Sequence, residues 1–259
     1  MRAPFRAVVI TGASSGLGAA LACAYARPGV VLGLIGRDIG RLAAVADACR
    51  AAGAMADIAL LDVSDRAPLE AWLTAFDQSH QVDLVIANAG TSAGPEPGSA
   101  GEATDVTLRQ IGVNLLGAVH TAAPLVPAMA ARGRGQIGLI ASVAAYRGLP
   151  YSPGYCASKA GLRAYGEALR ALTAPHGVGV TVACPGFFAS RMTDRWEGPT
   201  PFLMSTERAA RIIKRGIDRG CRRVSFPWPL VLGMRFCDLL PAALGDAILR
   251  RFRFRIRAA

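Results

Sequence analysis

A tyrosine and a lysine four residues apart, Tyr155 and Lys159, are the pair in this sequence best suited to proton transfer. Residues at this spacing lie on the same face of a helix, so both side chains point the same way. A free phenol has a pKa of about 10 and is a poor acid or base at neutral pH. A nearby ammonium favours the phenolate and lowers that pKa. Ser142, at the end of a predicted strand, offers a hydroxyl for a reacting oxygen, so the three residues predict proton transfer at a carbonyl or alcohol.

The segment from Thr11 to Gly18 reads TGASSGLG and lies between a predicted strand and a predicted helix. Glycines there allow a tight turn, a close approach of the backbone to a pyrophosphate and close packing of helix on strand. The start of the helix offers free N–H groups to phosphates. The spacing is G-x-x-x-G-x-G rather than G-x-G-x-x-G, but its place in the first strand–helix unit favours a dinucleotide site. The expected contacts are Gly12, Ser14, Ser15, Gly16, Leu17 and Gly18.

The second predicted strand should end near the adenosine ribose, and it reads Leu34-Ile35-Gly36-Arg37. An NAD-binding chain usually places Asp or Glu at this point to bond the ribose hydroxyls. Here Arg37 takes that place, and a guanidinium suits a 2′-phosphate. Alternatively, Arg37 is a solvated loop residue and Asp38 takes the acidic role. The sequence therefore predicts NADP(H) as the preferred cofactor, with NAD(H) possible.

These residues need a scaffold, and the chain alternates between β-branched apolar runs and segments with helical spacing. Such alternation predicts a parallel sheet covered by helices on both faces. The predicted strands are 7–11, 30–35, 58–61, 84–87, 136–141, 178–183 and 223–226, and the predicted helices are 15–26, 41–52, 69–78, 105–131, 155–173 and 206–219. We expect one α/β domain over residues 1–227, with a bend near Pro124 and Pro127 in the longest helix.

Taken together, the motifs resemble those of the short-chain dehydrogenase/reductase family, in its single-domain branch. The resemblance covers residues 7–226 and implies a Rossmann-type doubly wound sheet. It rests on motifs that follow in family order: T-G-x-x-x-G-x-G at Thr11–Gly18, Asn88-Ala89-Gly90, Asn114, Ser142, Y-x-A-S-K at Tyr155–Lys159, and Pro185-Gly186.

The resemblance implies roles for four residues in catalysis. Tyr155 is similar to the general acid of the reduction, and Lys159 to the group that lowers its pKa and bonds the nicotinamide ribose. Ser142 is similar to the hydroxyl that orients the carbonyl. Asn114 is similar to the residue that holds a water in a proton relay to Lys159. Hydride transfer is then the chemistry of the nicotinamide, and no metal is needed.

The resemblance also implies further cofactor contacts. Asp62 is similar to the acid at the adenine edge and Val63 to a residue against the ring. Asn88 is similar to a residue that fixes the central strand, followed by Ala89 and Gly90. After Pro185-Gly186 the chain departs from the family's P-G-x-[IV]-x-T, because it reads Phe187-Phe188-Ala189-Ser190. Ser190 can replace Thr as a donor, and Phe188 stands in place of the family's aliphatic residue, with its main-chain contact retained.

The residues expected around the substrate are mostly apolar: Val143, Tyr146, Leu149, Tyr151, Phe187, Phe188, Met192, Trp196, Phe202 and Met204. Such a lining favours a lipophilic or aromatic substrate over a sugar or a small acid. We expect a reductase of a ketone or aldehyde, or the reverse oxidation, with a long-chain 3-keto lipid or a steroid-like alcohol as candidates. The alternatives are a 3-oxoacyl-carrier reductase and a non-catalytic dinucleotide-binding or scaffold protein.

Composition indicates which partners, metal sites and cellular compartment to expect. The formal net charge is +11, almost all from Arg, which predicts attraction to phosphates or reflects a GC-rich genome. The positive charge is the only feature that favours nucleic-acid binding, and no recognised motif accompanies it. Nucleic-acid binding is therefore not expected. The six Cys form no C-x-x-C pair and the three His are scattered, so no metal site is predicted. Reduced core cysteines and the lack of an apolar signal core indicate a cytoplasmic protein. A homo-oligomer, dimer or tetramer, is expected.

The last segment, residues 228–259, does not resemble the short end typical of soluble family members. Its apolar residues are followed by a cluster of arginines: Arg250, Arg251, Arg253, Arg255 and Arg257. Leu232, Phe236, Leu239 and Leu240 form one stripe at helical spacing. An amphipathic stretch beside an Arg cluster predicts contact with the inner face of a membrane. The alternatives are a dimerisation arm, an arm that covers the pocket, and an edge strand where Arg alternates with Phe and Ile.

Overall fold

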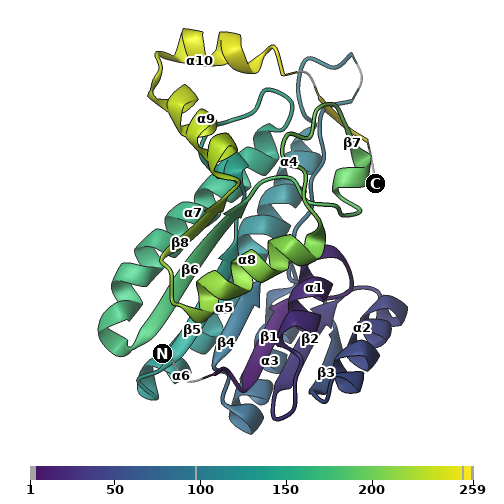
Figure 1. The fold of residues 1–259 in the computed structure, drawn as a ribbon, viewed down its shortest axis with the longest axis vertical. Helices are drawn as coiled ribbons and strands as arrows, with labels where there is room; N and C mark the ends of the chain where they lie inside the picture. The colour runs from purple at the N-terminus through teal and green to yellow at the C-terminus, as the bar shows by residue number, and fades with distance from the viewer. Residues whose placement is uncertain (1–3, 97, 253, 258–259) are drawn as a thin grey trace.

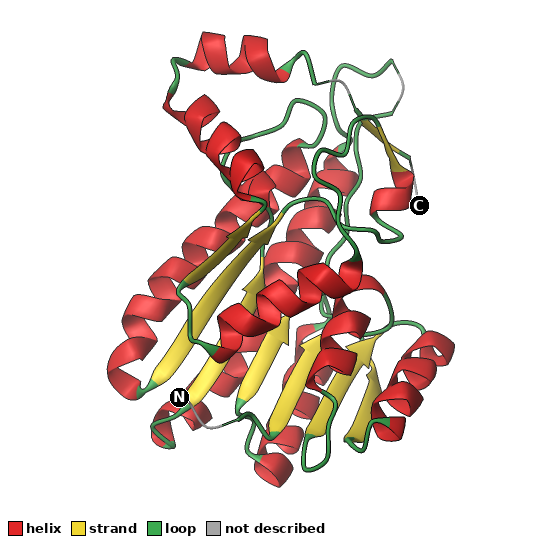
Figure 2. Ribbon diagram, viewed as in Figure 1, coloured by secondary structure: helices red, strands yellow, loops and turns green. Residues whose placement is uncertain are grey.

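The computed structural model describes residues 4–96, 98–252 and 254–257. Its centre is a seven-stranded parallel sheet in the order β3-β2-β1-β4-β5-β6-β8, drawn as yellow arrows in Figure 2. The strands are β1 (Ala7–Thr11), β2 (Val31–Gly36), β3 (Met55–Leu60), β4 (Leu84–Ala87), β5 (Gly135–Ile140), β6 (Val178–Pro185) and β8 (Arg223–Phe226). This confirms the expected α/β Rossmann-type fold.

The middle strands are mostly apolar because helices cover both faces of the sheet. All residues of β1 and β4 are buried. β1 pairs with β2 through Ala7↔Val31 and with β4 through Val8↔Leu84. The strand order reverses between β1 and β4, and this crevice at the carboxyl ends is where ligands bind in such folds.

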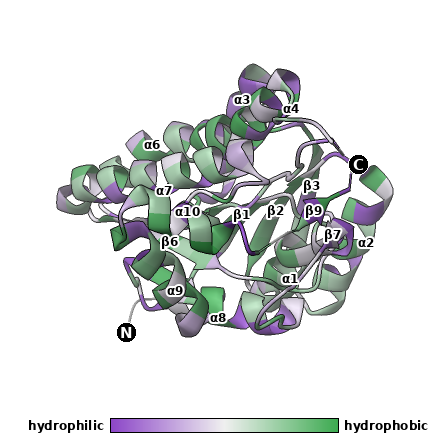
Figure 3. Ribbon diagram, turned by 90° about the horizontal axis from the view of Figure 1, so that it is seen from above, coloured by the Kyte–Doolittle hydropathy of each residue, from purple (hydrophilic) through white to green (hydrophobic). Residues whose placement is uncertain are grey.

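Two sets of helices bury separate cores against the two faces, and Figure 3 shows the sheet between them from above (Figures 1 and 3). On one face lie α1 (Gly16–Tyr25), α2 (Ile39–Ala51) and α8 (Thr206–Asp218), which pack Leu21, Leu42 and Ile213 on the sheet. On the other lie α3 (Arg66–His80), α5 (Gly117–Ala122) and α7 (Pro153–Thr173), which pack Leu73, Ala122 and Leu162. A buried apolar stripe on each helix is what holds these layers together.

The long predicted helix is interrupted twice. It consists of α4 (Thr104–Ile111), a π-helical turn (Gly112–Leu116), α5, a 3-10 turn (Ala123–Leu125) and α6 (Val126–Ala131). Pro124 lies in the 3-10 turn, where the expected break occurs because proline has no N–H for the α-helical ladder. The π turn was not predicted. By length and composition alone, Thr104–Ala131 could cross a membrane, a test that the core helices of soluble proteins also pass.

The segment after Pro227 leaves the seven-stranded sheet and contributes one strand to a separate two-stranded sheet. It forms α9 (Trp228–Leu239) and α10 (Ala242–Leu249), which Figure 1 shows in yellow-green beyond the carboxyl ends of the strands. The chain then forms β9 (Arg255–Ile256), antiparallel to β7 (Trp196–Glu197) with Trp196 opposite Ile256. An edge strand, which was one alternative for the arginine-rich segment, is therefore present over these two residues. Arg253, part of the expected arginine cluster, lies outside the described residues.

Candidate active site

Helix α7 carries Tyr155 and Lys159 in its first two turns and begins at Pro153, a residue that suits the first helical position. A carboxylate from a distant loop caps this helix. Glu102 Oε2 accepts hydrogen bonds from Gly154 N at 3.0 Å and from Thr107 Oγ1 at 2.6 Å. A side chain at Gly154 would collide with this carboxylate. A negative charge at a helix N-terminus is favourable, so Glu102 fixes the start of the catalytic helix.

Tyr155 and Ser142 meet at the carboxyl end of β5. The Tyr155 hydroxyl is hydrogen-bonded to Ser142, and Ser142 Oγ accepts from Ala144 N at 3.2 Å. Burial raises the pKa of the Tyr155 phenol to about 12, against a smaller lowering by the bond to Ser142. The two hydroxyls therefore lie together, with the phenol held in its protonated form at neutral pH.

Lys159 lies behind this pair and is almost fully buried. Its Nζ donates to the Ile140 carbonyl at 2.8 Å and lies 5.7 Å from the centre of the Tyr155 ring. Burial lowers the pKa of the Lys159 ammonium to about 8. The sequence predicted that Lys159 lowers the pKa of Tyr155. In this structure burial disfavours the charged forms of both groups and outweighs any such lowering, so the net shift of the Tyr155 pKa is upward, and the effect of the ammonium stays a prediction.

Asn114 lies in the π turn, a feature that is often found at functional sites. Its Oδ1 accepts from Thr91 N at 2.7 Å, and its Nδ2 donates to Thr91 O at 2.9 Å and to Ser158 Oγ at 3.0 Å. The side chain thus ties the loop after β4 to the catalytic helix. The water relay to Lys159 stays a prediction.

A cavity of about 990 Å³ extends along the carboxyl ends of the strands from the glycine turn to Tyr155. Gly12 and Gly16 have φ angles of 65° and 54°, which glycine adopts without strain. The first turn of α1 has no acidic residue, and Ser15 makes no side-chain cap bond, so its N–H groups are available to a phosphate. These groups fit the pyrophosphate of a dinucleotide.

Most of the predicted site residues line this one cavity. They are Gly12, Ser14, Ser15, Gly16, Leu17, Arg37, Asp62, Val63, Asn88, Ala89, Gly90, Ser142, Tyr155, Lys159, Pro185, Gly186, Phe188 and Ser190. Gly18 and Asn114 are not among its lining residues. Gly18 instead packs against the Gly12 carbonyl and Asn88, where a Cβ has no room.

Asn88 joins the two central strands. Its Nδ2 donates to Thr11 O at 3.0 Å, while Thr11 Oγ1 accepts from the N–H groups of Asn88 and Ala89 at 3.1 and 3.2 Å. These bonds lock the glycine turn to the loop after β4. They agree with the partly structural role that the sequence predicted for Asn88.

The segment after β6 closes over the glycine turn. Gly186 N donates to Phe226 O at 2.7 Å, and Thr193 Oγ1 donates to Phe188 O at 2.7 Å. Phe188 forms a bridge with Met204 and packs against the core beneath α1 and α8. A Cβ at Gly16 would lie 3.7 Å from Ser190 Cβ, so Ser190 faces the turn. Phe188 is thus accommodated as a core residue.

At the adenosine end, both carboxylates near the end of β2 are paired with arginines. Arg37 Nη1 lies 3.2 Å from Asp62 Oδ2, and Arg41 Nη2 lies 2.9 Å from Asp38 Oδ2. Asp38 also caps α2 through Arg41 N. Partial burial raises the pKa of Asp62, but hydrogen bonds from Ser64 and Arg37 outweigh it, so that pKa lies below its usual value. Arg41, which the sequence analysis did not select, adds a second guanidinium to the cavity wall.

Comparison with known proteins identifies the family. The sequence profile of the short chain dehydrogenases matches residues 6–199. The chain belongs to the short-chain dehydrogenase/reductase family. It is 38% identical to an uncharacterized oxidoreductase of Myxococcus xanthus, over 96% of this chain and 98% of the relative. It is 34% identical to the ketoacyl reductase HetN of Nostoc, over 70% of this chain and 63% of that protein.

Two solved structures are similar to this dehydrogenase in fold, and both hold the same ligand. A short-chain dehydrogenase from Sphingobium yanoikuyae in complex with NADPH has a TM-score of 0.77 and 26% identity, over 94% of this chain and 92% of that one. A variant of actinorhodin polyketide ketoreductase with NADPH has a TM-score of 0.78 and 25% identity, over 87% of this chain and 97% of that one. The family's cofactor is NAD(P).

Several of the apolar residues predicted to surround the substrate line the outer part of this cavity. Of the predicted apolar residues, Val143, Leu149, Phe187, Phe188, Met192 and Trp196 line the cavity. Tyr146 instead bonds Ser225 at 2.7 Å, and Phe202 is exposed. Tyr151 and Met204 also lie outside the lining: Tyr151 packs on Phe254, and Met204 forms a backbone bridge with Phe188.

The C-terminal strand closes the outer end of this cavity. Phe254 stacks on Trp196 with centroids 4.0 Å apart, and the edge of Tyr151 meets it at 5.4 Å. Ile256 lines the cavity and Arg257 N donates to Arg195 O at 2.9 Å. An arm that covers the pocket was one alternative predicted for this segment. The contact of Ile256 was not predicted, because no local pattern marks a contact between residues so far apart.

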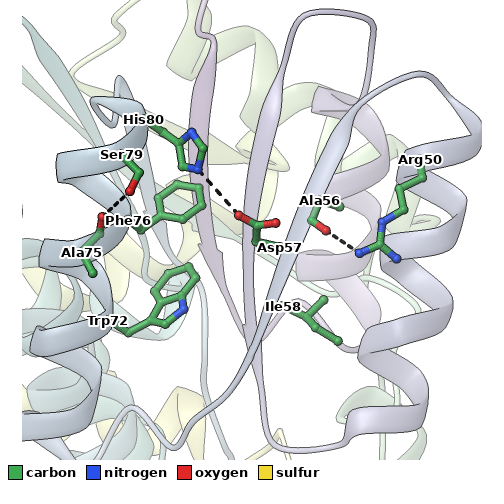
Figure 4. Close-up of a pocket in the computed structure, with 9 residues that line it drawn as sticks. All are labelled: Arg50, Ala56, Asp57, Ile58, Trp72, Ala75, Phe76, Ser79 and His80. Atoms are coloured by element: carbon green, nitrogen blue, oxygen red, sulfur yellow. Dashed lines mark hydrogen bonds and ion pairs between the residues drawn. The ribbon is translucent and has the colours of Figure 1, made fainter.

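A second pocket, of about 420 Å³, lies at the other end of the sheet beside the edge strand β3 (Figure 4). Trp72 stacks on Phe76 at 4.9 Å there, and His80 Nε2 lies 3.7 Å from Asp57 Oδ2. The last turns of α3 line it, and α3 runs back to the amino ends of the strands. This pocket is therefore remote from the catalytic residues.

Proposed function

We propose that this dehydrogenase is an NADP(H)-dependent reductase of a lipophilic ketone or aldehyde, able to oxidise the corresponding alcohol in reverse. The observation that carries the proposal is the meeting of Ser142, Tyr155 and Lys159 in one cavity. Its outer lining includes Leu149, Met192 and Trp196, beside Asp194 and Arg195. A long-chain 3-keto lipid or a steroid-like compound is the substrate class that the apolar residues of this lining favour.

In the reduction, the bound nicotinamide supplies the hydride that the carbonyl carbon accepts. The hydroxyls of Ser142 and Tyr155 hold the carbonyl oxygen between them. Because burial raises the pKa of Tyr155 to about 12, the phenol carries its proton at neutral pH and can donate it to that oxygen. The product is the alcohol, and the phenolate that remains lies near the Lys159 ammonium. In the oxidation, the phenolate would take the alcohol proton, which higher pH favours.

The preference for the phosphorylated cofactor rests on the end of β2. Arg37 and Arg41 both line the cavity there, and the nearby carboxylates of Asp62 and Asp38 each have an arginine partner. A guanidinium fork matches a 2′-phosphate. Two structures similar to this chain hold NADPH. Together these observations favour NADP(H) over NAD(H).

A 3-oxoacyl-carrier reductase is a second candidate, and a row of arginines on α8 favours it. Arg208, Arg211, Arg215 and Arg219 are all exposed and follow one another at helical spacing. An acidic carrier protein would find a complementary surface there. The names of two similar proteins, a ketoacyl reductase and a polyketide ketoreductase, point to acyl-chain carbonyls as well. A non-catalytic scaffold is disfavoured, because binding alone needs no proton donor in the cavity.

The test is a panel of carbonyl compounds with NADPH and with NADH, followed by the absorbance of the reduced cofactor. The panel includes short and long 3-keto esters, a ketosteroid and a 3-oxoacyl thioester on an acidic carrier protein. We expect turnover with NADPH that increases with the length of the apolar chain. Turnover of the carrier thioester alone would select the second candidate. No turnover of any carbonyl, with tight NADPH binding, would contradict a reductase.

A further inference from the structure

Helix α9 turns a row of large apolar side chains away from the rest of the molecule. Trp228, Leu232, Phe236 and Leu239 are between 58 and 84% exposed, whereas Met234 and Cys237 are buried. At about 100° per residue, the four exposed side chains fall within an arc of about 80°, and the buried ones lie on the opposite side. The exposed row is therefore not part of the core that holds α9 in place.

Helix α10 and the turn after it extend this apolar surface. Leu244, Ile248 and Phe252 are exposed, while Gly245 and Leu249 face the protein. Figure 1 shows α9 and α10 together beyond the carboxyl ends of the strands, away from the body of the sheet. We call the seven exposed apolar side chains of this segment the α9–α10 surface. Exposed apolar patches of this kind mark interaction sites.

The net charge beside this surface is positive. Arg235 lies about 20° from Trp228 around the helix axis, within the exposed face. Arg250 and Arg251 follow α10 and are exposed. The carboxylates of the described part of the segment, Asp238 and Asp246, lie 3.9 and 2.7 Å from the guanidinium of Arg147, which offsets one of their two charges. The partner of the surface must therefore accept apolar side chains and positive charge together.

We propose that the α9–α10 surface docks on an anionic lipid bilayer. The apolar row would enter the interface between headgroups and acyl chains, and the three arginines would meet lipid phosphates. A second copy of this chain fits less well. In a two-fold contact the same surface faces itself, which would bring Arg235, Arg250 and Arg251 toward the same three positive charges.

The position of the α9–α10 surface near the cavity gives membrane docking a functional role. The docking proposal itself does not depend on the proposed reductase activity. Helix α9 follows β8 directly, so it begins at the end of the sheet where the catalytic cavity lies. The chain continues from α10 to Ile256, which lines that cavity. A lipophilic substrate dissolved in a bilayer would then have a short path to Tyr155.

The test is co-sedimentation of the full chain with phosphatidylcholine vesicles, with and without about a third of phosphatidylglycerol. We expect the wild type to sediment with the anionic vesicles and at least about tenfold less with the neutral ones. Trp228→Ser/Phe236→Ser removes apolar side chains, and Arg250→Glu/Arg251→Glu reverses two charges. Each pair should weaken binding to anionic vesicles by about tenfold or more.

Two matched controls change exposed residues elsewhere. Leu172→Ser removes an exposed apolar side chain of α7, and Arg211→Glu/Arg215→Glu reverses two exposed charges of α8. Both controls should sediment like the wild type, and circular dichroism should show all variants folded. Equal sedimentation of surface variants and controls, or equal binding to both kinds of vesicle, would overturn the proposal. A dimer in light scattering that Trp228→Ser/Phe236→Ser converts to a monomer, without vesicle binding, would assign the surface to a second copy instead.

Discussion

The glycine turn after β1 and the outer end of the substrate cavity are held in different ways. The turn is fixed by hydrogen bonds between neighbouring buried strands, as Asn88 donates to Thr11 O and Gly18 packs on Gly12. The outer end is closed by rings from three distant segments, where Tyr151, Trp196 and Phe254 meet. The cofactor side thus belongs to the rigid core, while the substrate side is held by surface segments. Mutations on the cofactor side should therefore have large effects on the reaction and on the choice of cofactor. Mutations on the substrate side should have small effects on the choice of substrate.

The largest effect is expected at the proton donor. Tyr155→Phe removes the phenol oxygen and should lower kcat for carbonyl reduction by about 10²–10⁴-fold, because general acid catalysis contributes that much. NADPH should still bind with an unchanged dissociation constant in a fluorescence titration, because the glycine turn is intact. Tyr165→Phe, on the same helix, is the matched control and should keep its activity. A Tyr155→Phe variant with more than about a tenth of wild-type activity would refute the role of general acid.

A smaller but specific effect is expected at the adenosine end. Arg37→Asp replaces a guanidinium by a carboxylate that repels a 2′-phosphate, so the ratio of kcat/KM for NADPH over NADH should fall by about ten- to a hundredfold. Arg109→Asp, an exposed arginine of α4, controls for the change in net charge. Wild-type protein that uses NADH as well as NADPH would contradict the assignment of Arg37, whatever the variant does.

The pH dependence of kcat tests the buried pair of Lys159 and Tyr155. Burial lowers the pKa of Lys159 to about 8 and raises that of Tyr155 to about 12. As the pH rises through about 8, the ammonium is lost while the phenol keeps its proton. The phenolate formed in the reduction then lacks its positive neighbour, so kcat should fall with a midpoint near pH 8. Initial rates at saturating substrate, from about pH 6 to about pH 10, measure this. A rate that stays constant over that range would contradict it.

The smallest effect is expected at the closing strand. Phe254→Ala removes a stack on Trp196, an interaction worth about 0.5–1.5 kcal/mol beyond buried area. KM for a long apolar substrate should rise about three- to tenfold. For a short substrate, kcat should be unchanged. Phe252→Ala, an exposed ring two residues earlier, serves as the control. If Phe254→Ala changes short and long substrates equally, the strand is a general part of the fold and not a wall for the substrate.

Local patterns made the cofactor side predictable. Strands read as apolar runs, and the glycine turn, Asn88 and the Tyr155–Lys159 pair are each defined within a few residues of the chain. They were therefore visible without a structure, and most of the predicted site residues line one cavity. Arg41 was not predicted because it lies beyond the end of β2. Its place at the cavity wall depends on where α2 begins, which only the structure shows.

The remainder depends on contacts between distant residues. Glu102 caps α7 from 52 positions away in the chain, and no spacing rule links the two. The direction of the pKa shift of Tyr155 was predicted from one neighbour, but burial decided it. Three of the four residues of the stripe predicted for the last segment, Leu232, Phe236 and Leu239, are exposed together. The fourth, Leu240, is half-buried and lies outside the exposed row.

Arg147 joins two parts of the molecule that have been described separately. It stands on the loop that follows Ser142, and its guanidinium holds Asp238 of α9 and Asp246 of α10. It also lies against Gly245, where a Cβ would come within 3.1 Å of Nη2. A tilt of the two helices would therefore pull on a side chain anchored only five residues from the catalytic hydroxyl. One side chain in this way ties the two helices with the exposed apolar surface to the loop that begins at Ser142.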